Sequence, residues 1–134
     1  MNIRITDGTV VFEKGSIGRE VTRRLFLNSA IGSGAEVLVD NEPYVTYRFY
    51  PEHGIAASAS FVGDRLSDVT WLLEFPDEKD REWTQELELE RKQKHDDWLL
   101  SELGIPPYGY TWGQITSSFD SKGCVSDIIL HYGS

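Results

Sequence analysis

Three successive stretches of the sequence alternate apolar and polar residues with the two-residue period of a β-strand. They run from Tyr44 to Tyr50, from Gly54 to Val62 and from Val69 to Phe75. The links between them are short and contain glycine, as at Gly63-Asp64. Because a parallel crossover needs a dozen or more residues, these links favour antiparallel neighbours in one β-meander.

The second of these stretches places small side chains on its apolar face. Ala57 and Ala59 alternate there with polar residues, which predicts that a larger group packs closely over them. A different interpretation is that this face, together with Tyr47, Trp71 and Trp112, lines a ligand cavity instead of a closed core. The sequence leaves both interpretations open.

A long, polar, helix-favouring stretch follows, from about residue 78 to residue 103. Asp77 is a plausible N-cap, and acidic residues fill the first turn, where they suit the helix dipole. Gly104 is placed to cap the C-terminus, and Pro106-Pro107 prevents continuation. At 1.5 Å per residue this helix would be about 39 Å long, enough to cross a small sheet.

The faces of this helix differ in character. Its apolar side is expected to face the sheet, and it comprises Trp83, Leu87, Trp98, Leu99 and Leu103. Its middle, from Glu88 to Lys94, is strongly polar, with favourable i,i+4 pairs at Glu88–Lys92 and Glu90–Lys94. We expect this middle part to project beyond the edge of the sheet.

The remaining sequence supplies a short helix and two hairpins. Ile3 to Phe12 predicts a hairpin that turns at Asp7-Gly8. Residues 20–29 predict a short helix, with Thr22 as a possible N-cap. Tyr110 to Phe119 and Cys124 to Tyr132 predict a last hairpin.

The predicted fold class is therefore α+β, in one domain spanning residues 1–134. An antiparallel sheet of about six to seven strands packs against one long C-terminal helix (about 78–103) and a short N-terminal helix (about 20–29). Several strand orders satisfy the same alternation, so the order stays open.

The hairpins on either side of the long helix echo each other. Ser60-Phe61 followed by Ser67-Asp68-Val69 recurs as Ser118-Phe119 followed by Ser126-Asp127-Ile128. Turns favour Ser, Asp and Gly in any case, so coincidence is the other explanation. A true repeat would make the two hairpins equivalent.

The charge of the chain bears on its partners. It has 22 acidic residues against 13 Lys and Arg, and a formal net charge of −9. Binding of nucleic acid or of an anionic membrane surface requires clustered basic residues, so both are disfavoured. An acidic surface suits a basic protein partner.

Neither the N-terminal residues nor any later stretch has the apolar core of a signal peptide or of a membrane span. Cys124 is the only cysteine, which excludes an intramolecular disulfide. These features predict a cytoplasmic location.

Residues that could carry chemistry are scattered. His53, His95 and His131 belong to no metal-binding spacing, and Cys124 has no adjacent base. Glycine-rich phosphate loops and nucleophile elbows are absent from the sequence. We therefore predict no catalytic residue, no metal site, no cofactor and no enzymatic activity.

Candidate partner contacts come from two places. Tyr108, Tyr110 and Trp112 stand beside glycines and offer broad amphipathic contact area. Glu86 and Glu90 add acidic groups from the long helix. The other interpretation of the aromatic segment is that its rings pack onto the sheet.

This small, acidic, motif-free α+β build resembles that of bacterial immunity proteins, which neutralise toxins. The resemblance covers no aligned motif and implies no site residues. It implies a protein-binding module that inhibits a basic toxin or nuclease. Two alternatives stand beside it: a ligand-binding or enzymatic domain with a pocket between helix and sheet, and a homodimer joined through a strand edge or the aromatic segment.

Overall fold

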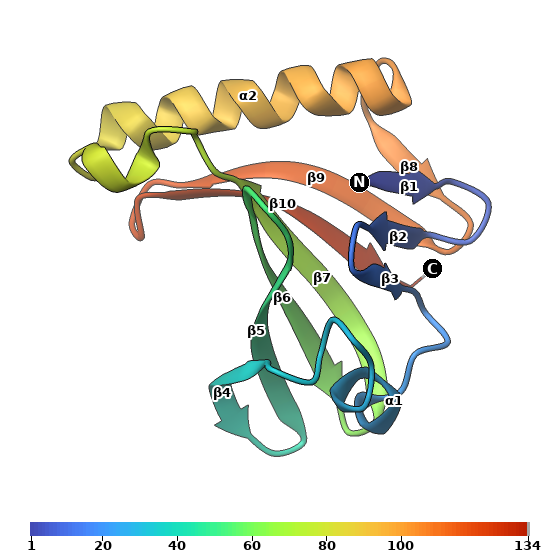
Figure 1. The fold of residues 1–134 in the computed structure, drawn as a ribbon. Helices are drawn as coiled ribbons and strands as arrows, with labels where there is room; N and C mark the ends of the chain where they lie inside the picture. The colour runs from blue at the N-terminus through green and yellow to red at the C-terminus, as the bar shows by residue number, and fades with distance from the viewer. Residues whose placement is uncertain (134) are drawn as a thin grey trace.

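The computed structural model describes residues 1–133, which form two antiparallel sheets, two α-helices and one 3₁₀ turn. The small sheet has the order β1-β2-β3 and the large sheet the order β4-β5-β6-β7-β10-β9-β8 (Figure 1). The strands are β1 (Asn2–Arg4), β2 (Thr9–Phe12), β3 (Gly15–Ile17), β4 (Glu36–Asn41), β5 (Tyr44–Glu52), β6 (Ile55–Val62), β7 (Arg65–Leu73), β8 (Tyr108–Tyr110), β9 (Gly113–Asp120) and β10 (Val125–Tyr132). The helical segments are α1 (Arg23–Leu27), η1 (Glu78–Asp80) and α2 (Gln85–Leu103).

The large sheet confirms the predicted α+β fold and settles its strand order. Strands β5 to β7 form the expected meander, and β4 adds one strand at its edge. Helix α2 then crosses to β8 at the far edge, and the last hairpin returns so that β10 pairs antiparallel with β7. Alternation cannot predict this return. It shows which face of each strand is buried, but it does not show which strand of the last hairpin pairs with β7.

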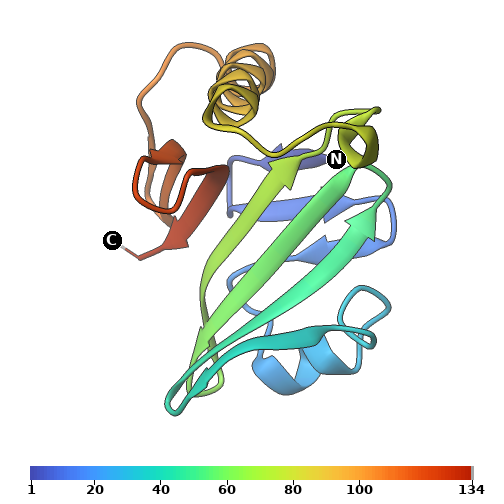
Figure 2. The same cartoon turned by 90° about the vertical axis from the view of Figure 1, so that its left-hand side faces the viewer.

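One face of the large sheet is covered by other elements. The ring of Trp71 on β7 packs edge-on against the rings of Phe12 of β2 and Trp98 of α2. Each pair of ring centroids is 6.4 Å apart, so the small sheet and α2 pack on the same side. Figure 2 shows the opposite face of β5 to β7 with no element in front of it. The small sheet and α2 therefore share one core on the covered face.

The covered face is a closed aromatic core. Ala59 pairs with Tyr47 and Ala57 with Trp71, and all four side chains are buried. Phe26 of α1 fills the space beside them, with its ring 6.0 Å from that of Tyr47. The prediction that bulky groups pack near the alanines is confirmed, and this part of the face does not line a ligand cavity.

The long helix is shorter than predicted, and Asp77 is not its N-cap. Helix α2 starts at Gln85, where the hydroxyl of Thr84 accepts the Leu87 N–H at 3.1 Å. Glu78 lies in a separate 3₁₀ turn, and its carboxylate accepts the Phe75 N–H at 3.0 Å. The Glu78 side chain is thus engaged with the preceding strand, and the chain starts its helix at the next good cap.

Two further differences concern the N-terminal half. Helix α1 spans five residues instead of ten, although Thr22 caps it as predicted and accepts the Leu25 N–H at 3.2 Å. Strand β4 was not predicted, because its apolar residues are consecutive and do not alternate. Strand β3 was also missed, and its three residues are too few to show a period.

The sequence echo has a structural counterpart. Ser60 pairs with Asp68 across β6 and β7, and Ser118 pairs with Asp127 across β9 and β10. The two hairpins therefore place the same residue types at equivalent cross-strand positions.

Candidate partner-binding surface

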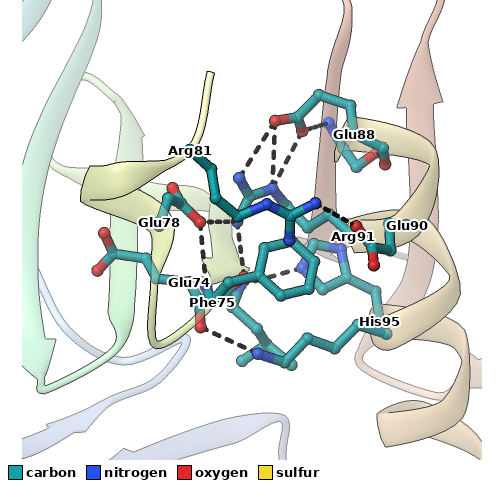
Figure 3. Close-up of polar contacts among 11 residues, drawn as sticks. Glu74, Phe75, Glu78, Arg81, Glu88, Glu90, Arg91 and His95 are labelled. Carbon is teal, nitrogen blue, oxygen red and sulfur yellow. Dashed lines mark hydrogen bonds and ion pairs between the residues drawn. The ribbon is translucent and has the colours of Figure 1, made fainter. Parts of the chain in front are cut away.

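The polar middle of α2 faces inward and does not project beyond the sheet. Glu88 is 2% exposed, Arg91 2% and His95 0%. They follow one another at helical spacing on the side of α2 that also carries the buried Leu99. We call Glu78, Glu88, Arg91 and His95 the anchor network (Figure 3).

Arg91 is the centre of the anchor network. Its Nη1 donates to the Leu73 carbonyl at 2.7 Å and to Glu78 Oε1 at 2.8 Å. Its Nε donates to Glu88 Oε1 at 3.1 Å, and Nη2 donates to Glu88 Oε2 at 3.2 Å. The guanidinium thus has two carboxylates and one carbonyl around it, as a buried cation requires.

Glu88 links α2 to β10. Its Oε1 accepts the Ser126 N–H at 2.9 Å, and its backbone carbonyl accepts the Ser126 hydroxyl. Ser126 is fully buried. Glu88 therefore accepts hydrogen bonds from both the backbone N–H and the hydroxyl of a core serine.

Cations also surround the ring of Phe75, just after β7. The side chains of Arg81, Arg91 and Lys94 lie 5.0, 5.3 and 4.8 Å from its centroid. Lys94 Nζ also donates to the Glu74 carbonyl at 2.9 Å. These contacts fix the start of α2 against the end of β7, and Figure 3 labels Phe75, Arg81 and Arg91 among them.

His95 is held as a neutral ring. Its Nε2 accepts the Leu73 N–H at 3.0 Å, so the ring proton is assigned to Nδ1. Burial, followed by the charge of Arg91, lowers the pKa of His95 to about 4. For Glu78, burial acts to raise the pKa, but the hydrogen bonds from Arg91 and the Phe75 N–H outweigh it and hold the pKa below its usual value.

The anchor network is structural in its chemistry. Its charges pair with one another, and its hydrogen bonds lead to backbone groups of β7 and β10. Its consequence is orientation, because it fixes which side of α2 faces solvent.

The solvent side of α2 is acidic with apolar residues between the acids. We call it the outer face, and it comprises Glu86, Leu89, Glu90, Gln93, Asp97 and Leu100. Leu89 is 47% exposed and Leu100 is 51% exposed. Just before the helix, Trp83 is 61% exposed, although the sequence pattern had placed it against the sheet.

The basic residues of α2 are turned away from the outer face. Arg91 is buried, and Lys94 binds the Glu74 carbonyl. Lys92 Nζ contacts both carboxylate oxygens of Asp96 at 2.8 Å. The i,i+4 pairs predicted at Glu88–Lys92 and Glu90–Lys94 are therefore replaced by other partners, and Glu90 on the outer face pairs with Arg81.

The structure separates the predicted contact residues into two groups. Glu86 and Glu90 are exposed near the start of α2, and Glu90 binds Arg81 Nη2 at 2.7 Å. The aromatic segment lies beyond the other end of the helix (Figure 1). The two groups do not form one patch.

Most of the aromatic segment serves packing. Trp112 is buried, and its Nε1 donates to the Ile5 carbonyl at 2.7 Å, which ties the small sheet to the large one. Tyr108 is also buried and donates its hydroxyl to the Gly104 carbonyl at 2.9 Å. Tyr110 is half-buried and stacks on Trp112 with the ring centroids 5.0 Å apart. A contact role for Tyr110, Glu86 and Glu90 stays a prediction.

A hollow of about 520 Å³ lies between α2 and the β8–β9 edge. Its lining includes Lys92, Asp96, Leu99, Tyr108 and Ser117. Among residues 1–133, no three His, Cys, Asp or Glu side chains come together as a possible metal site. Neither helix in that range has the length and apolar character needed to span a membrane.

Comparison with known proteins gives a likeness of fold. No protein-family model matches the sequence, and no curated protein does. A solved chain from the structure described as "Rhs1-CT in complex with cognate immunity protein RhsI1" is similar, with a TM-score of 0.61 and 16% sequence identity. The match covers 98% of this chain and 86% of that chain. At this identity, what the two chains share is their fold.

Proposed function

We propose that this chain is a non-enzymatic immunity protein that binds and inhibits a basic toxin or nuclease in the bacterial cytoplasm. The observation that carries the proposal is the outer face of α2. There the acids are exposed, while the basic residues of the helix are buried or pair internally. A buried ionic network holds that face toward solvent.

Charge favours a basic partner. The net charge of −9 gives a long-range attraction to such a protein, and this speeds encounter at low salt. Glu86 and Asp97 supply acidic groups to the outer face at opposite ends, about 16 Å apart along the helix at 1.5 Å per residue.

Apolar groups supply the contact that charge alone lacks. Interface energy concentrates in a few large side chains that become buried on binding, with Trp strongly over-represented. Trp83, Leu89 and Leu100 are about half exposed or more; the two leucines lie on the outer face, and Trp83 lies just before the start of α2. We assign Trp83 as the residue that contributes most to binding of the partner.

The likeness of fold supports the same class of function. The description of the similar structure names a cognate immunity protein in complex with Rhs1-CT. A shared fold does not carry over a function. The proposal therefore rests on the charged and apolar surface, and the similar structure adds to it.

The test starts with capture of the partner. The protein is used as bait in lysate of its source organism, at low and then at raised salt. The captured protein is identified, expressed alone and then expressed together with this chain. We expect it to be basic, to be released as salt rises, and to stop growth unless this chain is present.

Two double variants make the test specific to the outer face. Glu86→Lys with Asp97→Lys reverses two exposed charges of α2, and should abolish growth rescue. Glu13→Lys with Glu20→Lys makes the same change of net charge elsewhere on the exposed surface, and should preserve rescue. Equal rescue by both double variants would contradict the proposal.

The hollow beside α2 supports a second candidate, binding of a small ligand. It has the size of a ligand pocket and combines apolar residues with Lys92 and Asp96. A ligand thermal-shift screen tests this candidate. A compound that raises the unfolding temperature of the wild type, but not of a variant in which Thr116→Trp fills the hollow from an exposed lining residue, would favour it.

A further inference from the structure

Strand β4 is exposed in a way that no other strand of the large sheet is. All six of its residues, from Glu36 to Asn41, are exposed. Val37 is 56% exposed, Leu38 45% and Val39 48%. Along most strands of the large sheet, by contrast, buried residues recur on the covered face.

The free side of β4 also has backbone groups to offer. It is the end strand of the large sheet, and within residues 1–133 it pairs with β5 alone (Figure 1). The register shifts between Val37 and Val39, and pairing then continues regularly to Asn41. An edge of this kind presents a row of N–H and C=O groups that only an extended chain can match.

A second copy of this chain fits the edge poorly. An antiparallel pair centred on Leu38 would place Glu36 opposite Asp40, and like charges directly opposite each other destabilise a sheet. Shifting the register by one residue places the apolar Val37 opposite Asp40 instead. Each copy would also carry a net charge of −9.

An extended segment with basic residues fits the edge better. Lys or Arg opposite Glu36 and Asp40 would pair with the acids, and apolar side chains between them would cover the three exposed apolar residues. Glu36 pairs in register with Arg48 on β5, whereas Asp40 pairs with Val45 and has no cation directly opposite on that strand.

We infer that β4 is a docking edge for an extended segment of a protein partner, which adds as a strand and carries Lys or Arg on both sides of an apolar centre. The inference does not depend on the outer face of α2. That face lies at the other end of the molecule (Figure 1), so the two surfaces can be tested separately.

The probe is a library of random peptides of roughly ten residues, long enough for one added strand. Peptides are selected on the wild-type protein, and the enriched ones are synthesised for affinity measurement. We expect them to alternate β-branched residues with others and to carry Lys or Arg near both ends. An absence of enriched peptides, or enrichment of peptides without basic residues, would overturn the inference.

Backbone methylation then tests strand addition itself. In an added strand, alternate N–H groups bond to β4 and the others face away. N-methylation of one alternate set should remove binding, and N-methylation of the other set should keep it. Equal effects of the two sets would overturn the inference.

A pair of variants locates the binding. Asp40→Lys should weaken the peptide about tenfold, whereas Glu20→Lys, with the same change of charge at another exposed site, should leave its affinity unchanged. A dimer mass for the free wild-type protein that Leu38→Lys, which sets two lysines opposite each other in such a pair, converts to a monomer mass would assign the edge to a second copy and overturn the inference.

Discussion

Glu88 and Arg91, three residues apart on α2, form a buried ion pair with Arg91 Nε 3.1 Å from Glu88 Oε1. Both side chains are almost wholly removed from solvent. A buried pair of this kind is costly to desolvate, and its value to the fold depends on both partners being present. Here the pair also connects β7 and β10 through Leu73 and Ser126.

Removing one partner should therefore destabilise the protein strongly. Arg91→Met leaves Glu88 buried without its cation, and we expect the free energy of unfolding to fall by about 3–5 kcal/mol. Arg81→Met removes a more exposed arginine near the same helix and should destabilise the protein far less. Chemical denaturation of both variants measures the difference, and equal losses would contradict a structural role for the buried pair.

His95 should make stability depend on pH. Its pKa is about 4 when folded and 6.5 in its ordinary state, so the unfolded chain binds the proton more readily. The stability that the neutral ring contributes is complete above pH 6.5. Roughly 3 kcal/mol of it is lost as the pH falls through about 4, the pKa of His95 in the folded protein. His95→Gln keeps an acceptor for the Leu73 N–H but cannot titrate in this range. The wild type should lose stability relative to this variant between pH 7 and 4, as measured by urea unfolding.

Asp127 should have the opposite pH dependence. Burial, followed by the charges of Asp120 and Glu88, raises its pKa to about 6. The ionised carboxylate therefore destabilises the fold above pH 6, and protonation relieves this as pH falls toward its ordinary value of 3.8. Asp127→Asn should stabilise the protein at pH 7.5, and the difference should shrink by pH 5. A constant difference over that range would count against the raised pKa.

Gly8 should be intolerant of a side chain. It has a φ of +75°, and a Cβ there would lie 2.6 Å from the indole of Trp112. Gly54 has a similar φ of +81° but open space around its Cβ position. Gly54→Ala should cost about 1–2 kcal/mol through its backbone, and Gly8→Ala should cost about 1–3 kcal/mol more because the indole must move. Thermal unfolding of the two variants isolates the contact with Trp112.

Much of the fold can be predicted because one face of the large sheet is buried. Val45, Tyr47 and Phe49 point to the core while their neighbours face solvent, so burial leaves a period of two in the sequence. The end of α2 is equally readable, because Gly104 has a φ of +87° and prolines follow.

The start of α2 is not readable from local sequence. Asp77 and Thr84 are both good N-caps, and the choice between them depends on Glu78, which binds Arg91 thirteen residues later. A local pattern carries no information on that contact. The pairing of β10 with β7 likewise depends on contacts between distant parts of the chain.

The inward middle of α2 was missed because its residues are charged. Glu88, Arg91 and His95 occupy the positions that apolar residues usually fill on a buried helix face. Their spacing relative to Leu99 was the available signal. A pattern based on hydropathy assigns charged residues to solvent and tryptophan to the core, so it missed the inward charged residues and wrongly assigned the exposed Trp83 to the core.

We propose that the outer face of α2 binds a basic partner. The most direct test of this proposal is calorimetric titration of the captured partner against three forms of the chain. These are the wild type, Trp83→Ala, and Glu86→Lys with Asp97→Lys. We expect Trp83→Ala to weaken binding at all salt concentrations by about 2 kcal/mol or more. The charge-reversed form should bind poorly even at low salt, where the wild type binds best. Unchanged affinity of both variants, with wild-type binding insensitive to salt, would contradict the account.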